Sequence, residues 1–387
     1  MQLYVCALAN LFDIAILGAG PAGSSAALTL KNSGLKVALI DKAGFPRHKT
    51  CGDAIPGPTL KALRQIIPDF NEELQQLTLK QSIKYCQIVA PNNKVIDIEW
   101  KAEAYNSPRL DFDGFLFSQV KKHTATEVFE GFEVGQITKE NNLWLLKKRN
   151  SDENIQARFV IGCDGANSVL AKYLDNSPIN RERYCTAVAA YYTGIISDNL
   201  TNKFYLFNNY LPGYFWVFPL GNNTFNVGFG IVASEAAKHN IKLREVMDSI
   251  IANESAVAPM FTNAIQTGEV KGFGLPIGGK NAPISGEGYM LAGDAASLID
   301  PLQGHGIDKA VYSGMFAAQK ATECFTNNNF SVEFIKGYDD TVYAKYGAEL
   351  RRNYRLMRLL NKQPWIVNAA ARFAGLSWVK KAVLKRF

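Results

Sequence analysis

The sequence predicts a mixed α/β fold, α+β overall, in which a parallel-sheet domain is interleaved with an antiparallel-sheet domain and followed by a C-terminal helical region. Three observations predict it. Glycine-rich turns follow apolar runs near the beginning, middle and end of the chain, the segments between them have strand composition with turn-like Asn and Gly clusters, and the chain is helical from about residue 336. A chain of 387 residues is long enough for two domains.

The first element is a βαβ unit at the N-terminus. Ile14 to Leu17 is an apolar run typical of a buried parallel strand, and a G-x-G-x-x-G turn follows it at Gly18, Gly20 and Gly23. The first glycine permits a tight bend, the second lets a pyrophosphate approach the backbone, and the third lets the helix pack on the strand. A second apolar run ends in Asp41, at the position where a carboxylate accepts a hydrogen bond from a ribose hydroxyl. The unit therefore predicts a Rossmann-like dinucleotide site.

Two later pieces repeat this design of apolar strand, turn and helix. In "FVIGCDGANSVLAK" the turn carries Asp164 and Gly165, and in "GYMLAGDAASLIDPLQGHGIDKAVYSG" it carries Gly293 and Asp294. A later bend in the second piece, from Pro301 to Gly306, precedes another helix. An aspartate at such a turn can accept hydrogen bonds from sugar or ribityl hydroxyls, and the N–H groups of a glycine bend can meet a flavin edge or an anion.

Together the three pieces resemble the FAD-binding pattern of the flavoprotein group typified by p-hydroxybenzoate hydroxylase, over about 300 residues. The segment "RLDFDGFL" is also similar to an element of that group whose arginine, here Arg109, contacts the cofactor. The resemblance implies a bound FAD. The residues expected to bind it are Gly18, Gly20, Ala22, Gly23, Asp41, Lys42, Arg47, Cys51, Arg109, Asp164, Gly165, Gly293, Asp294, Pro301, Gly304, Gly306 and Ile307.

Two stretches narrow the choice within that group. "KTCGDAIPG", from Lys49 to Gly57, is similar to the K-P-C-G-G-A-I-P signature of geranylgeranyl reductases, and "YFWVFP", from Tyr214 to Pro219, is similar to the Y-x-W-x-F-P part of another motif of that family. Pro212 stands one residue closer to the tyrosine than the family's proline does. The resemblance implies an FAD-dependent reductase that saturates isolated double bonds of a geranylgeranyl-type isoprenoid chain. Hydride would come from N5 of the reduced flavin, and a positioned group would supply the proton.

The candidate catalytic residues are Cys51, Tyr214, Trp216 and His305. A thiol in an apolar wall stays protonated and can act as the proton donor or as a gate beside the flavin, and Tyr214 and His305 are further candidate donors. Tyr214, Trp216 and Phe218 alternate, so they share one face of a strand that would line an apolar pocket. The alternatives stay open, because aromatic residues in a strand are ordinary core and a lone cysteine is commonly a small buried residue without chemistry.

Two residues depart from the pattern of the geranylgeranyl reductases. Asp53 stands where the signature has its second glycine, and His305 stands where the family commonly has an acid. Either change can alter the substrate or the proton chemistry. The resemblance therefore leaves the exact reaction open.

The same motifs allow other functions, because a fold does not decide a reaction. An aromatic monooxygenase or a halogenase would work through a flavin hydroperoxide. A halogenase also needs a lysine at the end of a tunnel, and Lys49 is the lysine that leaves this alternative open. Reduction of a quinone's isoprenoid side chain would look much the same in sequence. A non-catalytic flavin-binding redox partner would need neither Cys51 nor the aromatic strand. No separate fingerprint for NAD(P)H is visible, so the expected electron donor is transiently bound NADPH or a ferredoxin.

The motifs divide the chain into interleaved parts. We expect the FAD-binding domain at residues 1–80, 107–180 and 272–335, the substrate domain at 81–106 and 181–271, and a basic helical region at 336–387. The net charge of +7 arises in that last region, because Arg351 to Phe387 holds ten of the 42 Lys and Arg residues and no acid, which leaves 32 basic against 35 acidic residues elsewhere.

Basic residues with interfacial aromatics suit the surface of an anionic bilayer, from which a polyprenyl substrate would be delivered. The alternative is a helical cap with a solvated basic face. A nucleic-acid partner is not expected, because no base-reading fold accompanies the charge.

The six cysteines are scattered, without a C-x-x-C pair or a Cys/His cluster of zinc spacing, so we expect a reducing compartment and no metal site. The apolar N-terminal stretch lacks a basic region and a cleavage site, and no run of about 18 apolar residues occurs. We therefore expect an N-terminal extension in place of a signal peptide, and no spanning helix. The expected location is the cytoplasm, with peripheral contact at the inner face of the membrane.

Overall fold

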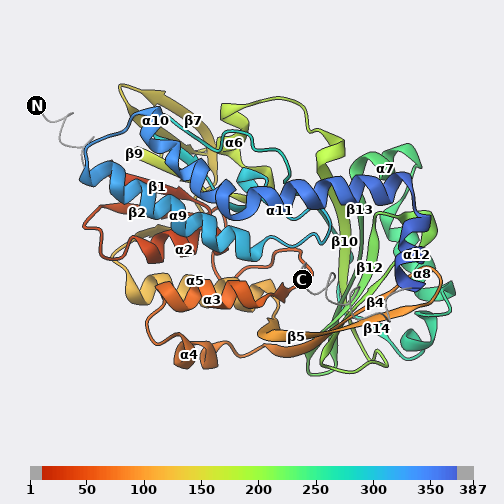
Figure 1. The fold of residues 1–387 in the computed structure, drawn as a ribbon. Coiled ribbons are helices and arrows are strands. Elements are labelled where there is room, and N and C mark those ends of the chain that lie inside the picture. Colours follow the sequence, from red (N-terminus) through yellow and green to blue (C-terminus); the bar gives the residue numbers. More distant parts are fainter. Residues whose placement is uncertain (1–10, 373–387) are drawn as a thin grey trace, which may run out of the picture.

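The structure of the protein is a computed structural model that describes residues 11–372. The predicted N-terminal extension up to residue 10, with Cys6, and the part of the predicted basic region from 373 to 387 lie outside the described residues. The described chain forms two β-sheets, with helices packed on the first sheet and one long helix running from the first to the second (Figure 1). This is the mixed α/β architecture that the sequence predicts.

The first sheet contains the N-terminal βαβ unit. Its strands are β1 (Leu11–Leu17), β2 (Val37–Ile40), β6 (Glu127–Phe129), β7 (Val134–Glu140), β8 (Leu143–Lys148), β9 (Asn154–Gly162), β16 (Ser285–Gly286) and β17 (Tyr289–Leu291). The order is β16-β17-β9-β1-β2-β6, and β8 and β7 continue from β9 as an antiparallel ribbon. β1 pairs in parallel with β2 and β9, and its Ile14 and Ile16 are fully buried, as in parallel sheets that are covered on both faces.

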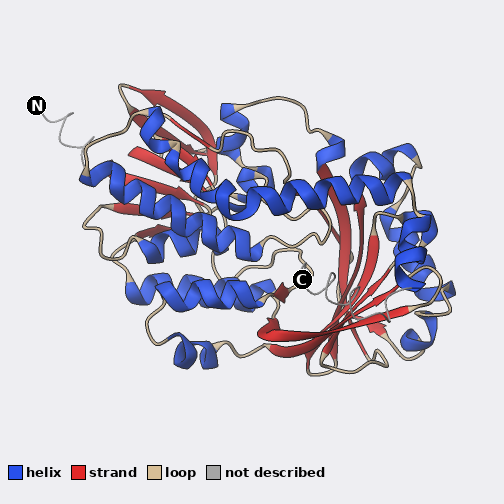
Figure 2. Cartoon of the chain, in the orientation of Figure 1, coloured by secondary structure: helices blue, strands red, loops and turns tan. Residues whose placement is uncertain are grey.

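Helices lie on this sheet or on the helices that cover it (Figure 2). They are α2 (Pro21–Thr29), α3 (Gly57–Ile66), α4 (Phe70–Glu73), α5 (Arg109–His123), α6 (Val169–Leu174), α9 (Ile307–Thr326) and α10 (Val332–Ile335). α2 is buried along nearly its whole length and contacts α5 and α9. The approach of α2 to α9 requires Gly314, because a Cβ atom there would lie 2.1 Å from the carbonyl oxygen of Ala22.

The turn at Gly293 differs from the prediction of a helix. The chain makes only a 3₁₀ turn, η6 (Gly293–Ala296), and then reaches Ser297, whose φ is 53°. A residue in the left-handed region commonly ends a helix, so the chain leaves η6 and passes to Asp300 and the bend that precedes α9.

The second sheet has nine described strands. They are β3 (Ala54–Ile55), β4 (Gln81–Val89), β5 (Val95–Asn106), β10 (Tyr184–Thr193), β11 (Thr201–Tyr205), β12 (Tyr214–Gly221), β13 (Thr224–Val232), β14 (Ile265–Gln266) and β15 (Lys271–Pro276). The order is β14-β10-β13-β12-β11-β4-β5-β3, with β15 also on β10. The sheet is antiparallel as predicted, except that β4 and β11 pair in parallel. These two strands come from separate segments, so no hairpin imposes an antiparallel pairing on them.

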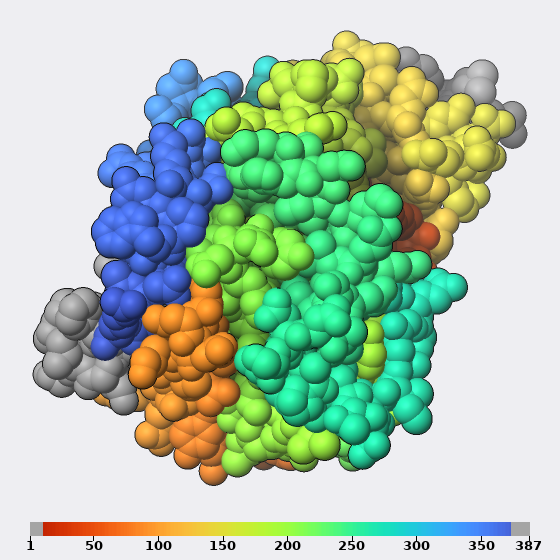
Figure 3. Space-filling view, turned by 90° about the vertical axis from the view of Figure 1, so that its right-hand side faces the viewer, coloured from red at the N-terminus to blue at the C-terminus, as the bar shows by residue number. Residues whose placement is uncertain are grey.

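The two faces of the second sheet have different neighbours. On β12, Phe215 and Val217 belong to an outer core that includes Met247 of α8 (Leu243–Asn253), next to α7 (Ala233–Lys238). Trp216 and Phe218 belong to a cluster on the opposite face, because successive side chains of a strand alternate. Figure 3 looks onto the outer side, where this layer (green) lies beside the C-terminal helices (blue).

The C-terminal helices are α11 (Gly337–Lys362) and α12 (Trp365–Arg372). α11 packs against α9 and reaches the second sheet, where Tyr354 and Met357 join a small core with Ile277 and Ile299 (Figure 1). Within residues 11–372, no helix is both long and apolar enough to cross a bilayer.

Two strands lie in the second sheet although the sequence assigns their residues, except Lys271, to the FAD-binding domain. They are β3, which pairs with β5, and β15, which pairs with β10. The division of the chain into domains stays a prediction, because strand pairing alone does not delimit a domain.

Candidate active site

One large cavity is lined by residues of both sheets. Its volume is about 870 Å³, and its walls include the glycine turn after β1, the loop from 47 to 58, the loop from 301 to 306 and the inner face of the second sheet. All the predicted FAD-binding residues except Gly23 line this cavity, and so do Tyr214, Trp216 and His305. Gly23 packs instead against the turn, where a Cβ atom would lie 1.8 Å from the carbonyl oxygen of Gly18.

The glycine turn presents the N-terminus of α2 to the cavity. Gly18 has a φ of 92°, in the region that favours glycine. The Asp41 carboxylate accepts hydrogen bonds from the N–H groups of Ala19 (2.8 Å) and Ala43 (2.9 Å), so it ties the turn to the end of β2. The free N–H groups of a helix start and its dipole favour an anion such as a pyrophosphate.

The turn after β9 leaves a buried acceptor without a partner. Asp164 Oδ2 accepts a hydrogen bond from the Val169 N–H (2.7 Å), whereas Oδ1 is buried and has no hydrogen-bond partner among residues 11–372. Burial raises the pKa of Asp164. An unpaired buried acceptor is costly, so this position fits a ligand that brings hydroxyl or N–H donors, as FAD does.

Two arginines converge on the buried carboxylate of Asp113. Nε and Nη2 of Arg109 lie 2.6 and 2.7 Å from its two oxygens, and Nη1 of Arg47 lies 3.1 Å from Oδ2. Arg109 is 4% exposed, so the bidentate pair holds it rigidly in the cavity wall. Arg109 and Cys51 both line the cavity and lie close to each other.

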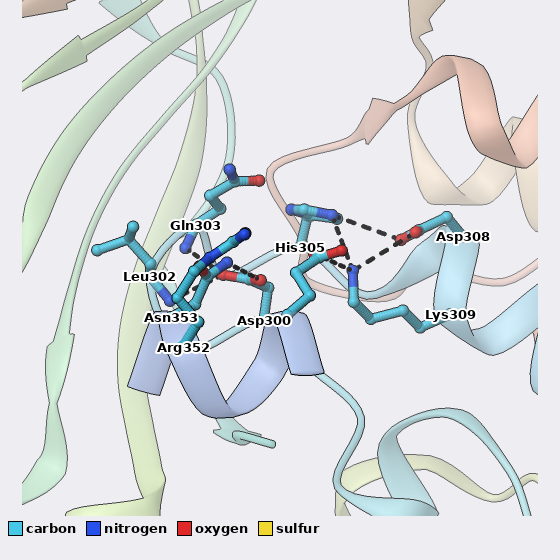
Figure 4. A network of polar contacts seen from close by, with 9 residues as sticks. Asp300, Leu302, Gln303, His305, Asp308, Lys309, Arg352 and Asn353 are labelled. Atoms are coloured by element: carbon cyan, nitrogen blue, oxygen red, sulfur yellow. Dashed lines mark hydrogen bonds and ion pairs between the residues drawn. The ribbon is translucent and has the colours of Figure 1, made fainter. Parts of the chain in front are cut away.

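Asp300 holds the loop from 301 to 306. It is fully buried, its Oδ1 accepts hydrogen bonds from the N–H groups of Leu302 (2.8 Å) and Gln303 (2.9 Å), and its Oδ2 accepts one from Nδ2 of Asn353 (2.7 Å) on α11 (Figure 4). Sequence reasoning missed both polar residues. The Asp-Pro pair was a local turn signal for Asp300, but nothing local marks Asn353, which is 53 positions away.

A buried charge cluster next to His305 was also missed (Figure 4). Lys309 is 1% exposed, and its Nζ lies 3.1 Å from His305 Nε2, 3.4 Å from Asp308 Oδ2 and 3.7 Å from Glu349 Oε1. Burial and the Lys309 charge lower the pKa of His305. His305 is therefore neutral at pH 7, with Nε2 as the acceptor toward Lys309 and its hydrogen on Nδ1.

Cys51 lies where the loop from 47 to 58 meets the second sheet. It is half-buried and lines the cavity, and its carbonyl oxygen accepts a hydrogen bond from Asn226 Nδ2 (2.7 Å). Lys49 and Asp294 form an ion pair of 3.5 Å in the same cavity. The Cys51 side chain thus lies between the cavity and the hydrophobic core.

The predicted aromatic row lies on one face of β12 and lines the cavity: Tyr214, Trp216 and Phe218. The Trp216 ring lies against Gly228, where a Cβ atom would come within 2.2 Å of it, and its Nε1 donates to Asn226 Oδ1 (2.8 Å). The Tyr214 hydroxyl donates to the carbonyl oxygen of Gln303 (2.5 Å). Its hydrogen is thereby engaged in holding the loop, and the donor role of Tyr214 stays a prediction.

Asp53 is fully buried and also lines the cavity. Its Oδ2 accepts hydrogen bonds from the Tyr191 hydroxyl (2.9 Å) and from Asn226 Nδ2 (2.8 Å). The sequence marked Asp53 only as a departure from a motif, and it did not mark Tyr191 or Asn226. A signal was present on β13, where Asn226, Gly228 and Gly230 alternate with large apolar residues and form a small, polar face.

The turns, the orphaned acceptor and the cavity define a flavoprotein, an FAD-dependent oxidoreductase. A family model described as "FAD binding domain" matches residues 12–329. A digeranylgeranylglycerophospholipid reductase of Methanoculleus marisnigri is 31% identical over 357 residues, which cover 90% of this chain and 86% of the relative. The chain belongs to the geranylgeranyl reductase family of FAD-dependent oxidoreductases.

Other similar proteins place the family in context. A menaquinone reductase of Mycobacterium tuberculosis is 29% identical over 318 residues, 79% of this chain and 76% of the relative. A solved geranylgeranyl bacteriochlorophyll reductase-like protein of Thermoplasma acidophilum has a TM-score of 0.85 at 24% identity, over 98% of this chain and 97% of its own. A flavin-dependent brominase has a TM-score of 0.74 at 19% identity, over 94% and 93%. At these identities the two structures share the fold alone.

Proposed function

We propose that this protein saturates isolated double bonds in the isoprenoid chain of a lipid, with FAD as its redox cofactor. The observation that carries the proposal is a single cavity with FAD-type turns in one part of its wall and the aromatic face of β12 in another. A largely apolar wall with a few fixed polar groups suits a polyprenyl chain. The names of two relatives, a digeranylgeranylglycerophospholipid reductase and a menaquinone reductase, support the same class of substrate.

When bound, FAD in its reduced form supplies the hydride for such a reaction. The chain's own residues bind, orient and protonate. Asp41 and Asp164 are the acceptors that we expect to hold the cofactor, and Trp216, fixed by Asn226, forms the wall along which the substrate chain would lie. An isolated alkene is a poor hydride acceptor, so a group in the cavity wall must deliver a proton to the second carbon.

Cys51 lines the cavity in which the substrate chain would lie, and its role as a gate that contacts this chain is part of the proposal. It is in the cavity wall, near Arg109. We expect Cys51→Ala to slow lipid reduction. Cys324→Ala is the matched control, because Cys324 is buried in α9 and does not line the cavity.

The test is an anaerobic reduction. The purified protein would be reduced with dithionite and mixed with a geranylgeranyl lipid, and the product would be followed by mass spectrometry. The proposal expects hydrogens to be gained in pairs, with a slower gain in Cys51→Ala. An unchanged lipid, together with rapid peroxide formation or oxygen insertion in air, would support the monooxygenase or halogenase alternative.

The same assay separates the remaining alternatives. A polyprenyl quinone offered in competition with the glycerolipid decides whether a quinone side chain is the better substrate, which the menaquinone reductase relative favours. The electron donor is identified by the reagent that bleaches the flavin without oxygen, either NADPH or a reduced ferredoxin. If neither NADPH nor reduced ferredoxin bleaches the flavin, both are excluded as the electron donor.

We also propose a peripheral membrane contact through α11. A surface pocket of about 450 Å³ is lined by five cations: Arg183, Arg351, Arg355, Arg358 and Lys362. Nη1 of Arg183 is buried and has no hydrogen-bond partner in the described part of the chain. Arg358 lies 3.5 Å from the exposed Glu182. An anionic lipid headgroup would satisfy the Arg183 nitrogen and the excess charge.

Vesicle sedimentation tests this contact. We expect binding to phosphatidylglycerol vesicles at low salt, weaker binding at high salt, and little binding to phosphatidylcholine. Replacing Arg351, Arg355 and Arg358 by Ser should reduce the bound fraction. Replacing Lys238, Lys242 and Arg244 of the α7–α8 region by Ser removes the same charge elsewhere and should not. Equal losses in the two triple variants would contradict the proposed contact.

A further inference from the structure

We propose that Asp53 is the proton donor for alkene saturation and that Tyr191 returns a proton to it from solvent. The inference rests on the proposed function and names a residue of that same site. Asp53 lies two positions after Cys51, among the residues that line the cavity, and its side chain is fully buried. The following observations carry the proposal.

The hydrogen bonds of Asp53 are distributed unequally between its two oxygens. Oδ2 accepts from both the Tyr191 hydroxyl and the Asn226 amide, whereas Oδ1 is buried and has no hydrogen-bond partner among residues 11–372. A carboxylic acid carries its hydrogen on the oxygen that is not already accepting from donors. The proton of Asp53 therefore belongs on Oδ1, where no described protein group takes it.

The surroundings favour the protonated form at neutral pH. Burial raises the pKa of Asp53 to about 7, against the lowering effects of Asn226, Tyr191 and the nearby Arg109. Arg109, on α5, is the cation that faces this group, and Tyr191, on β10, faces it with a hydroxyl whose own pKa is raised by burial and by Asp53. A donor with a pKa close to the working pH can both release and regain its proton.

The backbone also marks this position. Asp53 has a φ of 63°, in the region that favours glycine, and the similar motif of geranylgeranyl reductases has glycine there. The aspartate is kept in this conformation by its two side-chain hydrogen bonds and by its carbonyl oxygen, which accepts from the Ser107 N–H (2.9 Å). The preceding Gly52 abuts Phe218 of the aromatic wall, where a Cβ atom would lie 3.3 Å from the ring.

The other polar candidates are poorer donors. The Tyr214 hydroxyl donates to the Gln303 carbonyl, and the lowered pKa of His305 favours a neutral imidazole, whose N–H is a much weaker acid than a carboxyl group. Asn226 holds the Trp216 ring with its Oδ1 and Asp53 with its Nδ2, so it aligns the donor with the wall along which the substrate chain would lie. Cys51 is left with the role of contacting that chain.

The step balances as follows. Saturation of one C=C bond adds a hydride, which carries both electrons from the reduced flavin, to one carbon. The π electrons form the second C–H bond with the proton that leaves Asp53 Oδ1. Asp53 remains as a carboxylate, stabilised by Tyr191 and Asn226. The half-exposed Tyr191 passes its hydroxyl hydrogen to Oδ2 and takes another from solvent, and a half-turn of the carboxyl group then brings this hydrogen to the position of Oδ1.

The test combines two variants with two measurements. Asp53→Asn keeps the shape of the side chain without an acid, and Asp53→Gly places a glycine where φ favours one, so at least one should fold. Infrared difference spectra of the FAD-loaded protein, recorded without substrate, should contain the band of a protonated carboxyl that disappears as pH rises through about 7. Both variants should lack this band, and Cys51→Ala should keep it.

The second measurement is the rate of lipid reduction against pH. The rate of the wild type should fall above pH 7 by about tenfold for each pH unit, which gives the profile an alkaline limb. The rate of Cys51→Ala should fall in the same way. Both Asp53 variants should be slower by about 100-fold and lack this limb. A wild type that reduces no prenyl lipid overturns the proposed function and the donor role with it. An active wild type whose Asp53→Gly variant keeps the rate and the limb, or keeps the carboxyl band, overturns the role of Asp53 alone.

Discussion

The Tyr191 hydroxyl donates to Oδ2 of Asp53 across 2.9 Å, although the two residues are 138 positions apart. Tyr191 comes from β10 of the second sheet, and Asp53 comes from the loop that carries Cys51. A donor to a carboxylate stabilises its charged form, so this hydrogen bond opposes the effect of burial on the pKa of Asp53.

Tyr191→Phe should move the alkaline limb of lipid reduction to higher pH. The variant removes a donor that lowers the pKa of Asp53, so the carboxyl should keep its proton over a wider range. The measurement is the pH profile of the rate. Tyr192→Phe is the matched control, because the next tyrosine on β10 bonds Gln266 and not Asp53. A limb that stays in place in Tyr191→Phe would contradict this coupling.

Asp53 should also make folding stability depend on pH. Burial raises its pKa from 3.8 to about 7, so the folded protein holds this proton at pH values where the unfolded chain has lost it. The stabilisation is full below the unfolded pKa and is lost as pH rises through about 7. The free energy of unfolding, relative to Asp53→Asn, should fall by about 3 kcal/mol between pH 4.5 and pH 7.5, because part of the loss has already occurred at pH 4.5. Denaturant unfolding of both proteins at pH 4.5 and 7.5 measures it, and a difference that grows with pH would contradict the assignment.

Asn353→Ala should weaken FAD binding from a distance. The substitution leaves Oδ2 of the buried Asp300 without its donor, at a cost of about 1–3 kcal/mol, and frees the loop from 301 to 306. The dissociation constant of FAD should rise by about tenfold, as measured by fluorescence titration of the apoprotein. Asn361→Ala, on the same helix, removes a hydrogen bond to Glu235 that lies away from the loop. Equal affinities for FAD in the two variants would show that the Asn353 hydrogen bond on α11 does not support FAD binding.

Gly228→Ala should damage the lipid wall and spare the FAD site. The added Cβ atom would lie 2.2 Å from the Trp216 ring and 2.4 Å from the Val188 carbonyl oxygen, so ring and strand must shift at a cost of about 1–3 kcal/mol. We expect a yellow protein that binds FAD and reduces lipid slowly, as judged by absorbance and product mass. Gly272→Ala is the control, since a Cβ atom there meets nothing closer than 3.8 Å. Normal turnover in Gly228→Ala would show that the wall tolerates a displaced Trp216.

The FAD turns could be predicted because each is a local device. Gly18 needs a left-handed φ within one short segment, and Asp41 and Asp164 stand at the ends of apolar strands, so spacing along the chain is enough to find them. The aromatic row on β12 was predicted for the same reason, from alternation within one strand. The two misassigned features, the 3₁₀ turn at Gly293 and the parallel pairing of β4 with β11, depend on a single left-handed residue and on contacts between distant segments.

The sequence by itself determined the mixed α/β fold and the FAD-binding turns, because these depend on backbone requirements that consecutive residues satisfy. The similarity of two short stretches, at 49–57 and 214–219, indicated the geranylgeranyl reductase family. Only the tertiary structure decided which polar groups meet. It joined Asp53 to Tyr191, Asp300 to Asn353 and Lys309 to Glu349, three pairs that no spacing rule connects. The pKa of a buried group depends on the water removed from it and on the partners supplied by distant elements, so the proton chemistry proposed for Asp53 is a property of the folded chain.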